Sequence, residues 1–408
     1  MAASEPEQPA PKGRTPDESP GDCGRLAYVD PYGRVCLHTP GSGIDYLPLP
    51  GRPVGLPVEG DLPRHTRPGW SPDRRYLAAP GSKEHGGEGG LFIFDLHAPD
   101  TARWIPIDTP PIYAFWLPKH PSLGVLIPRP DGLSLEVLEG LGRTSPRREL
   151  FHGMPLFAHR RPHGNDLALH LGDTDQPNRR RVILVDPEDV QQAKVLTQTA
   201  GNLRAPTWSR DGQLLAYGVA LDEETSELVV MDSGGRQIRP GVRFTGPGAA
   251  SFSPDGNTLV LSAGTVGKLP LLAQAALIPV WGGVPRLIYD GPICCVAWVD
   301  NESLVAVVND SSGARWVRLD PTGGSPLALS PIIEPTPDAV FYAQFFDQFA
   351  HSHPLVSPDG HWLAYFTHGQ GLRGVPAPLI YLVDLTTTSE PILVGEGLTP
   401  AWAMGPVS

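Results

Sequence analysis

The chain has 408 residues and a formal net charge of −12, and 40% of its residues are hydrophobic. Binding to a phosphate backbone requires a concentrated basic surface, so this acidic balance argues against a nucleic-acid-binding protein. The 46 glycines and 48 prolines favour many tight turns over long helices.

The first segment, residues 1–22, is rich in Pro, Glu and Gly, and this composition predicts a disordered tail. The sequence has no signal-peptide core and no apolar run of about 18 residues, so we expect a soluble, cytoplasmic protein that does not span a membrane. Four cysteines are too few for a disulfide framework.

A phrase then recurs along the chain: an aromatic or apolar residue, a Ser-Pro-Asp-Gly turn, and a short apolar strand. The copies are Trp70–Asp73, Trp208–Gly212, Phe252–Gly256 and Val356–Gly360. Asp and Gly suit a tight hairpin turn, because Gly supplies positive φ and Asp caps the backbone. A period of about 45 residues built from short strands is typical of a β-propeller.

Each repeat predicts a four-stranded blade whose innermost strand ends at the aromatic residue. Degenerate copies fill the gaps, with innermost strands at Ala114–Trp116, Leu156–Ala158 and Val296–Trp298. The third strand often ends in an apolar residue followed by Asp, as at Phe94–Asp95, and a short fourth strand closes the blade, as at Arg103–Ile107.

The two ends of the chain complete one blade between them. Gly24–Tyr28 matches the second strand of a blade but has no first strand before it. Pro400–Ala403 matches the first strand of a blade but has no further strands after it. Sharing one sheet removes the free edges of an open array. We therefore predict one all-β domain over residues 23–408: an eight-bladed propeller of four-stranded blades, closed by its N- and C-terminal strands. Seven blades is the alternative if the poorly marked unit at 154–200 is miscounted.

The repeated Ser-Pro-Asp-Gly phrase resembles that of the TolB-like β-propeller family, over nearly all of residues 24–404. The resemblance implies the fold but not one function, since that family includes translocation partners, propeller domains of prolyl oligopeptidases and some lyases. A serine peptidase is excluded, because the sequence has no Gly-x-Ser-x-Gly nucleophile elbow.

The least generic segment is a short helical insertion at about 332–350. Thr336, Pro337 and Asp338 form a good helix start. At helical spacing five aromatic residues share one arc, and Gln344, Asp347 and Gln348 occupy the other; the aromatic residues are Phe341, Tyr342, Phe345, Phe346 and Phe349. Two interpretations stay open: a plug in the rim of its own propeller, or a lid or docking helix for a partner.

The stretch Gln348–Pro354 follows this helix and contains His351 and His353. Locally it is similar to oligogalacturonate lyase, in which a Gln-x-x-His-x-His stretch binds a divalent metal. The resemblance implies Gln348, His351 and His353 as ligands of zinc or manganese. Two further lyase histidines correspond to Cys295, a possible soft ligand, and to Ala249, which cannot bind. The alternative is that no cofactor binds and the histidines only shape the channel mouth.

One part of this acidic chain contains a cluster of basic residues. Two interpretations stay open: an ordinary solvated rim, or a patch that binds an anionic ligand or an acidic partner. Its members are Arg143, Arg147, Arg148, Arg160, Arg161, Arg179, Arg180 and Arg181, with His152, His159 and His163.

The sequence thus favours a non-enzymatic binding or scaffold propeller, which engages a protein partner or a small ligand through its loop-rich face and channel mouth. The residues expected to bind are His351, His353, Gln348, Phe341, Phe345, Arg179 and Arg180. The alternative is a metal-assisted lyase or hydrolase acting on an acidic carbohydrate, with Gln348, His351, His353 and Cys295 as the metal ligands.

Overall fold

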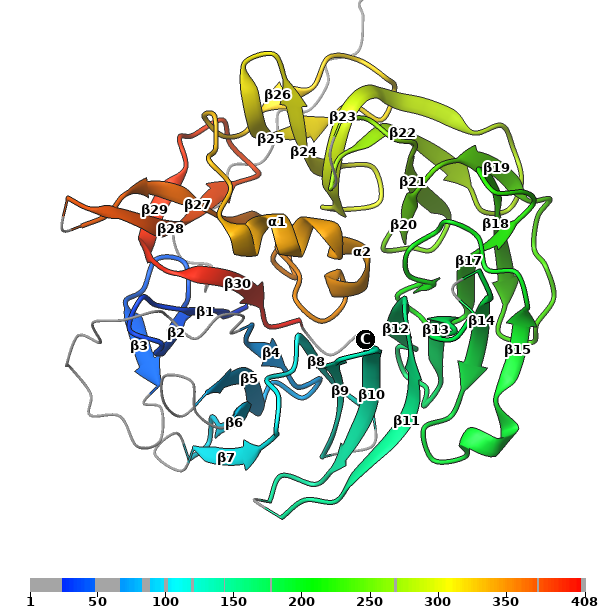
Figure 1. The fold of residues 1–408 in the computed structure, drawn as a ribbon. Helices are drawn as coiled ribbons and strands as arrows, with labels where there is room; N and C mark the ends of the chain where they lie inside the picture. The colour runs from blue at the N-terminus through cyan, green and yellow to red at the C-terminus, as the bar shows by residue number, and fades with distance from the viewer. Residues whose placement is uncertain are drawn as a thin grey trace, which may run out of the picture.

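The computed structural model describes residues 24–47, 67–82, 89–98, 102–118, 121–142, 144–176, 178–267, 270–372 and 374–404. The tail predicted over residues 1–22 lies outside these ranges. In the described residues the chain forms antiparallel sheets arranged around a central axis, with two short helices across the middle of one face (Figure 1). This all-β arrangement is that of a β-propeller. Within the described residues no helix is long and apolar enough to cross a membrane.

Four sheets come from the first half of the chain, together with a strand from its end. The first contains β1 (Leu26–Val29), β2 (Val35–His38), β3 (Ile44–Leu47) and β30 (Leu398–Trp402). The second contains β4 (Gly69–Trp70), β5 (Tyr76–Ser82), β6 (Gly89–Asp95) and β7 (Arg103–Pro106). The third contains β8 (Tyr113–Trp116), β9 (Ser122–Arg129), β10 (Gly132–Glu139) and β11 (Arg147–Gly153). The fourth contains β12 (Leu156–Arg160), β13 (Leu167–Gly172), β14 (Arg180–Val185) and β15 (Lys194–Thr197), with the 3-10 turn Val190–Gln192 before β15.

The second half of the chain forms a four-stranded, a seven-stranded and a three-stranded sheet. The four-stranded sheet contains β16 (Thr207–Trp208), β17 (Leu214–Ala220), β18 (Thr225–Asp232) and β19 (Val242–Thr245). The seven-stranded sheet contains β20 (Gly248–Phe252), β21 (Thr258–Ala263), β22 (Leu272–Pro279), the long β23 (Arg286–Trp298), β24 (Leu304–Asp310), β25 (Gly313–Leu319) and β26 (Leu327–Ala328). The last contains β27 (Trp362–Gln370), β28 (Pro376–Asp384) and β29 (Ile392–Glu396).

The repeated phrase is a hydrogen-bonded turn with the same contacts in each clear copy. In one copy the Ser209 hydroxyl donates to the Asp211 carboxylate at 2.5 Å and accepts from the Leu214 N–H at 2.9 Å. The same pair of contacts recurs around Ser71, Ser253 and Ser357. Gly212 follows at φ 67°, a conformation that glycine adopts without steric cost. These acids are therefore turn formers, as the sequence predicts.

The strand pairing predicted between the two ends of the chain is present. In β1 and β30, Leu26 lies opposite Trp402 and Ala27 opposite Ala401. Figure 1 shows the red C-terminal strand beside the blue N-terminal sheet.

The aromatic position of the repeat ties neighbouring sheets together. The Trp116 indole N–H donates to the Gly69 carbonyl at 2.9 Å, and the Trp402 indole donates to the Leu355 carbonyl at the same distance. In the fourth sheet the register differs from the prediction, because the innermost strand extends past Ala158 to Arg160. Arg160 lies opposite Leu167, just as Trp208 lies opposite Leu215. An arginine therefore occupies the aromatic position of this sheet.

The helical insertion consists of two helices, α1 (Pro337–Gln344) and α2 (Phe346–Phe349), separated at Phe345. The Thr336 hydroxyl caps α1 by accepting the Ala339 N–H at 3.0 Å, and Pro337 occupies the first turn, as predicted.

Candidate functional site

A cavity of about 590 Å³ lies on the axis of the propeller, lined by the ends of the innermost strands. At one end its walls come from the helical insertion, through Tyr342 and Phe346. At the other end they come from the repeat turns, through the residues at their second position, which are Pro72, Arg210, Pro254 and Pro358. Pro72 is exposed, whereas Tyr342 and Phe346 are buried. The cavity therefore lies on the turn side of the helices, opposite to the loop-rich face that the sequence favours.

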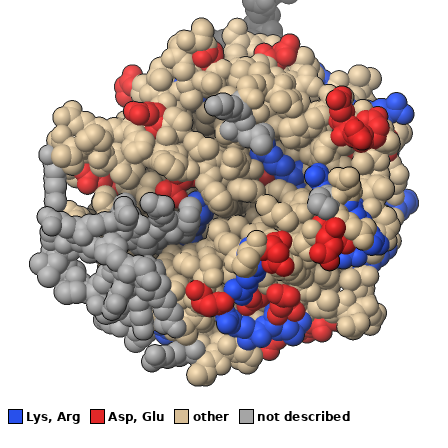
Figure 2. All heavy atoms as spheres, in the orientation of Figure 1, with Lys and Arg blue, Asp and Glu red and all other residues tan. Residues whose placement is uncertain are grey.

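The aromatic residues of the insertion pack into the propeller itself. The Phe349 ring is 1% exposed and meets the ring of Tyr113, on β8, at a centroid distance of 5.1 Å. Phe341 and Phe345, both predicted to bind a partner, contact each other with tilted rings at a centroid distance of 4.9 Å, and Phe345 also contacts Phe157 on β12. These contacts favour the plug interpretation. Figure 2, in the orientation of Figure 1, shows charged side chains both near the middle of this face and at its edge.

Two of the polar residues on the arc opposite the aromatic residues are buried: Asp347 is 1% exposed and Gln348 is 3% exposed. The Gln348 side-chain oxygen accepts the Ala158 N–H at 2.9 Å, and the Asp347 carboxylate accepts the Ala205 N–H at 3.1 Å. Both side chains therefore satisfy backbone N–H groups of the propeller, which need acceptors when buried. Burial raises the pKa of the Asp347 carboxyl.

Arg67, which the sequence analysis did not identify, fastens the start of α1. Its guanidinium is 2% exposed, contacts the Asp338 carboxylate at 3.3 Å and lies 4.3 Å from the centre of the Phe341 ring. Burial lowers its pKa to about 10, although Asp338 acts in the opposite direction. A buried guanidinium with one carboxylate and an aromatic face is a structural clamp.

His353 is held by two protein partners. One ring nitrogen, Nε2, faces the Arg67 carbonyl at 3.4 Å, and the other, Nδ1, lies 2.9 Å from the Ser352 hydroxyl. Ser352 in turn lies 2.8 Å from the hydroxyl of Tyr113. Burial lowers the pKa of His353 to about 3. Such an imidazole is a poor base, and its partner is a carbonyl instead of a carboxylate, so this Ser-His contact serves packing and not nucleophilic chemistry.

His351 points into the cavity beside His159. The two rings lie 4.6 Å apart, and both residues line the cavity. His159 accepts the Trp208 N–H on Nδ1 at 3.0 Å, and its buried Nε2 has no partner among the described residues. Burial, with Arg160 and Arg210 nearby, lowers the pKa of His351 to about 4. Both imidazoles are therefore neutral at pH 7. His351 lines the cavity and is only half-buried, so its ring can face a ligand, whereas Nε2 of His159 is buried.

Two arginines also line the cavity, Arg160 on β12 and Arg210 in the turn after β16. Among the described residues neither guanidinium has an ion-pair or hydrogen-bond partner, although the Arg160 backbone pairs with Leu167 in the sheet. Arg161, next to Arg160, differs: it pairs with Asp166 at 3.0 Å and donates to the Gly212 carbonyl at 2.8 Å. Burial lowers the pKa of Arg160.

The four residues predicted as metal ligands are not gathered into one site. His351 and Cys295 line the cavity, whereas Gln348 and His353 use their side chains on the Ala158 N–H and the Arg67 carbonyl. Within the described ranges, no three His, Cys, Asp or Glu side chains come together as metal ligands would. These contacts do not favour the lyase alternative, and metal binding stays a prediction.

The predicted basic cluster separates into three kinds of residue. Arg147 contacts Asp108, Arg148 contacts Glu139 and His152 contacts Asp131, at the rim. Arg179 is exposed, and Arg180 is half-buried at the start of β14 with its Nε unpartnered within the described residues. Arg179 and Arg180 do not line the cavity, so only Arg160, His159 and His163 of the cluster reach it. Arg143 lies outside the described residues.

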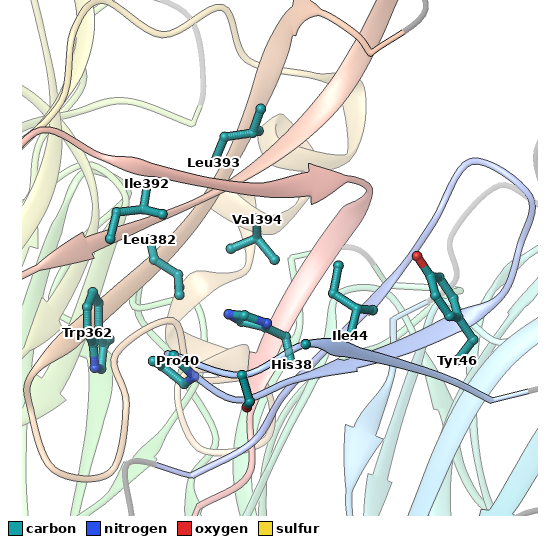
Figure 3. Close-up of a pocket in the computed structure, with 12 residues that line it drawn as sticks. His38, Pro40, Ile44, Tyr46, Trp362, Leu382, Ile392, Leu393 and Val394 are labelled. Atoms are coloured by element: carbon teal, nitrogen blue, oxygen red, sulfur yellow. The ribbon is translucent and has the colours of Figure 1, made fainter. Parts of the chain in front are cut away.

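A second, shallower pocket of about 470 Å³ lies at the periphery, where the β1–β3 sheet meets the β27–β29 sheet. Figure 3 shows His38, Ile44 and Tyr46 facing Leu382, Ile392 and Val394 across it. Most of its lining side chains are apolar, with His38, Ser42 and Tyr46 as polar members, and no Lys, Arg, Asp or Glu is among the described residues that line it.

Comparison with protein-family models and with curated protein sequences finds no match. Several solved structures are similar. TolB from Acinetobacter baumannii is 15% identical over 81% of this chain and 83% of its own, with a TM-score of 0.40. An oligogalacturonate lyase in complex with manganese is 12% identical over 70% of this chain and 82% of its own, with a TM-score of 0.47. A Mycobacterium tuberculosis puromycin-hydrolyzing peptidase is 14% identical, with a TM-score of 0.51, and the match covers 82% of this chain and 53% of the peptidase.

At an identity of 14%, the likeness to the peptidase concerns the fold alone. The resemblances expected from the sequence, to TolB-like propellers through the repeat and to oligogalacturonate lyase around Gln348–Gly360, are matched by similar solved structures at the level of the fold.

Proposed function

We propose that this protein is a binding propeller that holds a small molecule in its central cavity and carries out no reaction on it. The observation behind the proposal is the cavity itself. Its volume of about 590 Å³ falls in the range of about 300–1,000 Å³ that small-molecule sites occupy. Its walls are mainly apolar, with nine Phe, Tyr or Trp residues among them and a few polar side chains, which is the usual composition of such sites.

The helical insertion supports a small ligand over a protein partner. Its aromatic face is occupied by the propeller, through Tyr113 and Phe157, so little apolar surface is left for docking. A protein partner on the loop-rich face and a cytoplasmic location stay predictions from the sequence.

We infer that the ring has eight blades. The seven-stranded sheet supplies two, sharing the long strand β23, and the bridge between Val356 and Leu363 supplies the innermost position of the β27–β29 blade. The pairing of β1 with β30 supports closure of the ring.

The test is binding of a neutral fluorescent dye, N-phenyl-1-naphthylamine, which brightens in apolar sites. We expect one dye per chain, and we expect Ala297→Phe to abolish binding, because Ala297 lines the cavity. The matched control is Ala328→Phe at an exposed strand position, which should bind as the wild type does. If the wild type does not bind the dye, or if Ala297→Phe binds it normally while folded, the proposed function is wrong.

A further inference from the structure

We propose that the cavity recognises a small organic anion, whose carboxylate or phosphate group is held by Arg160 and Arg210 beside His351. The inference rests on the proposed function and adds the chemical class of the ligand. It is carried by three features of this chain, which concern charge, position in the repeat and the surrounding walls.

The first feature is uncompensated charge. Two arginines line the cavity, and the carboxylate that lines it with them, Asp73, is occupied by its own turn, where it accepts from the Ser71 hydroxyl at 2.6 Å. A guanidinium withdrawn from water is costly unless an anion pairs with it. The cavity walls thus carry two guanidinium groups and one carboxylate, a positive balance in a chain whose net charge is −12. A bound anion would supply the missing counter-charge.

The second feature is that both arginines break the repeat at positions that face the channel. Arg210 follows Ser209, where the other clear copies have Pro72, Pro254 and Pro358. Arg160 takes the register position held by tryptophan or phenylalanine in most innermost strands, as at Trp208. The turn and the strand are formed without these two arginines in other repeats, so their presence on adjacent sheets is not required by the fold.

The third feature is the set of neutral groups around the pair. Arg160, Arg210 and His351 all line the cavity, and the two arginines contribute to the lowered pKa of His351. The neutral ring of His159, which lies 4.6 Å from that of His351, carries its proton on the buried Nε2 because Nδ1 accepts from Trp208. Guanidinium groups and imidazole N–H donors are suited to carboxylate and phosphate oxygens. The aromatic walls suit an apolar body on the same molecule.

The experiment compares two dyes of the same shape: the neutral N-phenyl-1-naphthylamine and 1-anilinonaphthalene-8-sulfonate, which adds one anionic group. We expect the wild type to bind the anionic dye at least tenfold more tightly in low salt, and the preference to shrink as salt rises. Arg210→Pro restores the residue of the other repeats and should fold. It should lower the affinity for the anionic dye about tenfold and leave that for the neutral dye unchanged, as should Arg160→Gln.

Benzoate and phenyl phosphate then compete with the anionic dye, which distinguishes a carboxylate ligand from a phosphate ligand. Arg236→Gln, at an exposed surface arginine, is the charge-matched control and should change neither affinity. Equal binding of the two dyes by the wild type, or an unchanged preference in folded Arg210→Pro and Arg160→Gln, overturns the anion site while the cavity stands. Loss of both dyes from the wild type is the distinct failure of the proposed function.

Discussion

The backbone N–H of Trp208 donates to Nδ1 of His159 at 3.0 Å, across the junction between two neighbouring sheets. This contact fixes the proton of the neutral imidazole on Nε2, which faces no protein acceptor among the described residues. His159 thus joins two sheets through one ring nitrogen, while its other nitrogen stays buried at the wall of the cavity.

The buried histidines should make the protein sensitive to mild acid. The pKa is lowered from 6.5 to about 4 for His351 and to about 3 for His353. These histidines therefore bind protons near pH 6.5 in the unfolded chain but not in the folded chain. Because protons bind preferentially to the unfolded chain, the free energy of unfolding falls as the pH drops below 6.5. Each histidine contributes about 1.4 kcal/mol per pH unit.

We expect the melting temperature to drop between pH 7 and pH 5, and His353→Gln to flatten that dependence. His361→Gln, at an exposed position, should leave it unchanged. An equal melting temperature at pH 7 and pH 5 would contradict the prediction.

The plug should contribute strongly to stability through Phe349. Replacing this 1%-exposed ring with alanine opens a cavity among Tyr113 and the helix aromatics. We expect Phe349→Ala to lower the free energy of unfolding by about 3–5 kcal/mol. Urea unfolding measures it, with Leu372→Ala as control because Leu372 is 75% exposed. A loss below about 1 kcal/mol would show that the plug is not part of the packed core.

The proposed closure of the ring would depend on the pairing of β30 with β1, and Trp402 is the last residue of β30. The indole is fully buried and donates to the Leu355 carbonyl. We expect Trp402→Ala, or deletion of residues 399–408, to unfold or oligomerise the protein, because both leave a sheet edge unpaired or poorly packed. Circular dichroism and size-exclusion chromatography report the two outcomes. Trp281→Ala is the matched control, since Trp281 is 64% exposed; unchanged melting after the deletion would refute ring closure.

The contact between Arg67 and Asp338 should show coupling in a double-mutant cycle. Asp338→Asn removes the carboxylate from a guanidinium that is only 2% exposed, so the buried cation loses its ion-pair partner. We expect Arg67→Met to relieve part of that cost, with a coupling energy of about 1 kcal/mol or more from chemical unfolding. Additive effects of the two substitutions would mean that the contact carries no net energy.

The repeat itself was predictable from the sequence, since its contacts are local. The hydroxyl of Ser209 and the carboxylate of Asp211 lie two residues apart and satisfy the same turn in each clear copy. The pairing of β1 with β30 was also predictable, because an incomplete blade at one end of the chain requires its complement at the other.

The cavity was not predictable in the same way, because its contacts join distant segments. Gln348 and Asp347 look like the polar side of a surface helix until the ends of other strands present N–H groups to them. The register of Arg160 was missed because its copy lacks the Ser-Pro-Asp turn. One signal was available and not used: Arg210 interrupts a position that is proline in the other clear copies.

The insertion also has a consequence for how the chain reaches its native state. Its contacts with Ala205, Ala158, Tyr113 and Arg67 span 142, 190, 235 and 271 residues of sequence. No local segment can form them, so the helices can dock only after most of the ring has assembled. Docking of the insertion is therefore a late folding event, and the cavity comes into existence with it. A partly folded chain would have the strands but not the cavity. Binding of a ligand in the cavity would therefore indicate that the chain has folded completely.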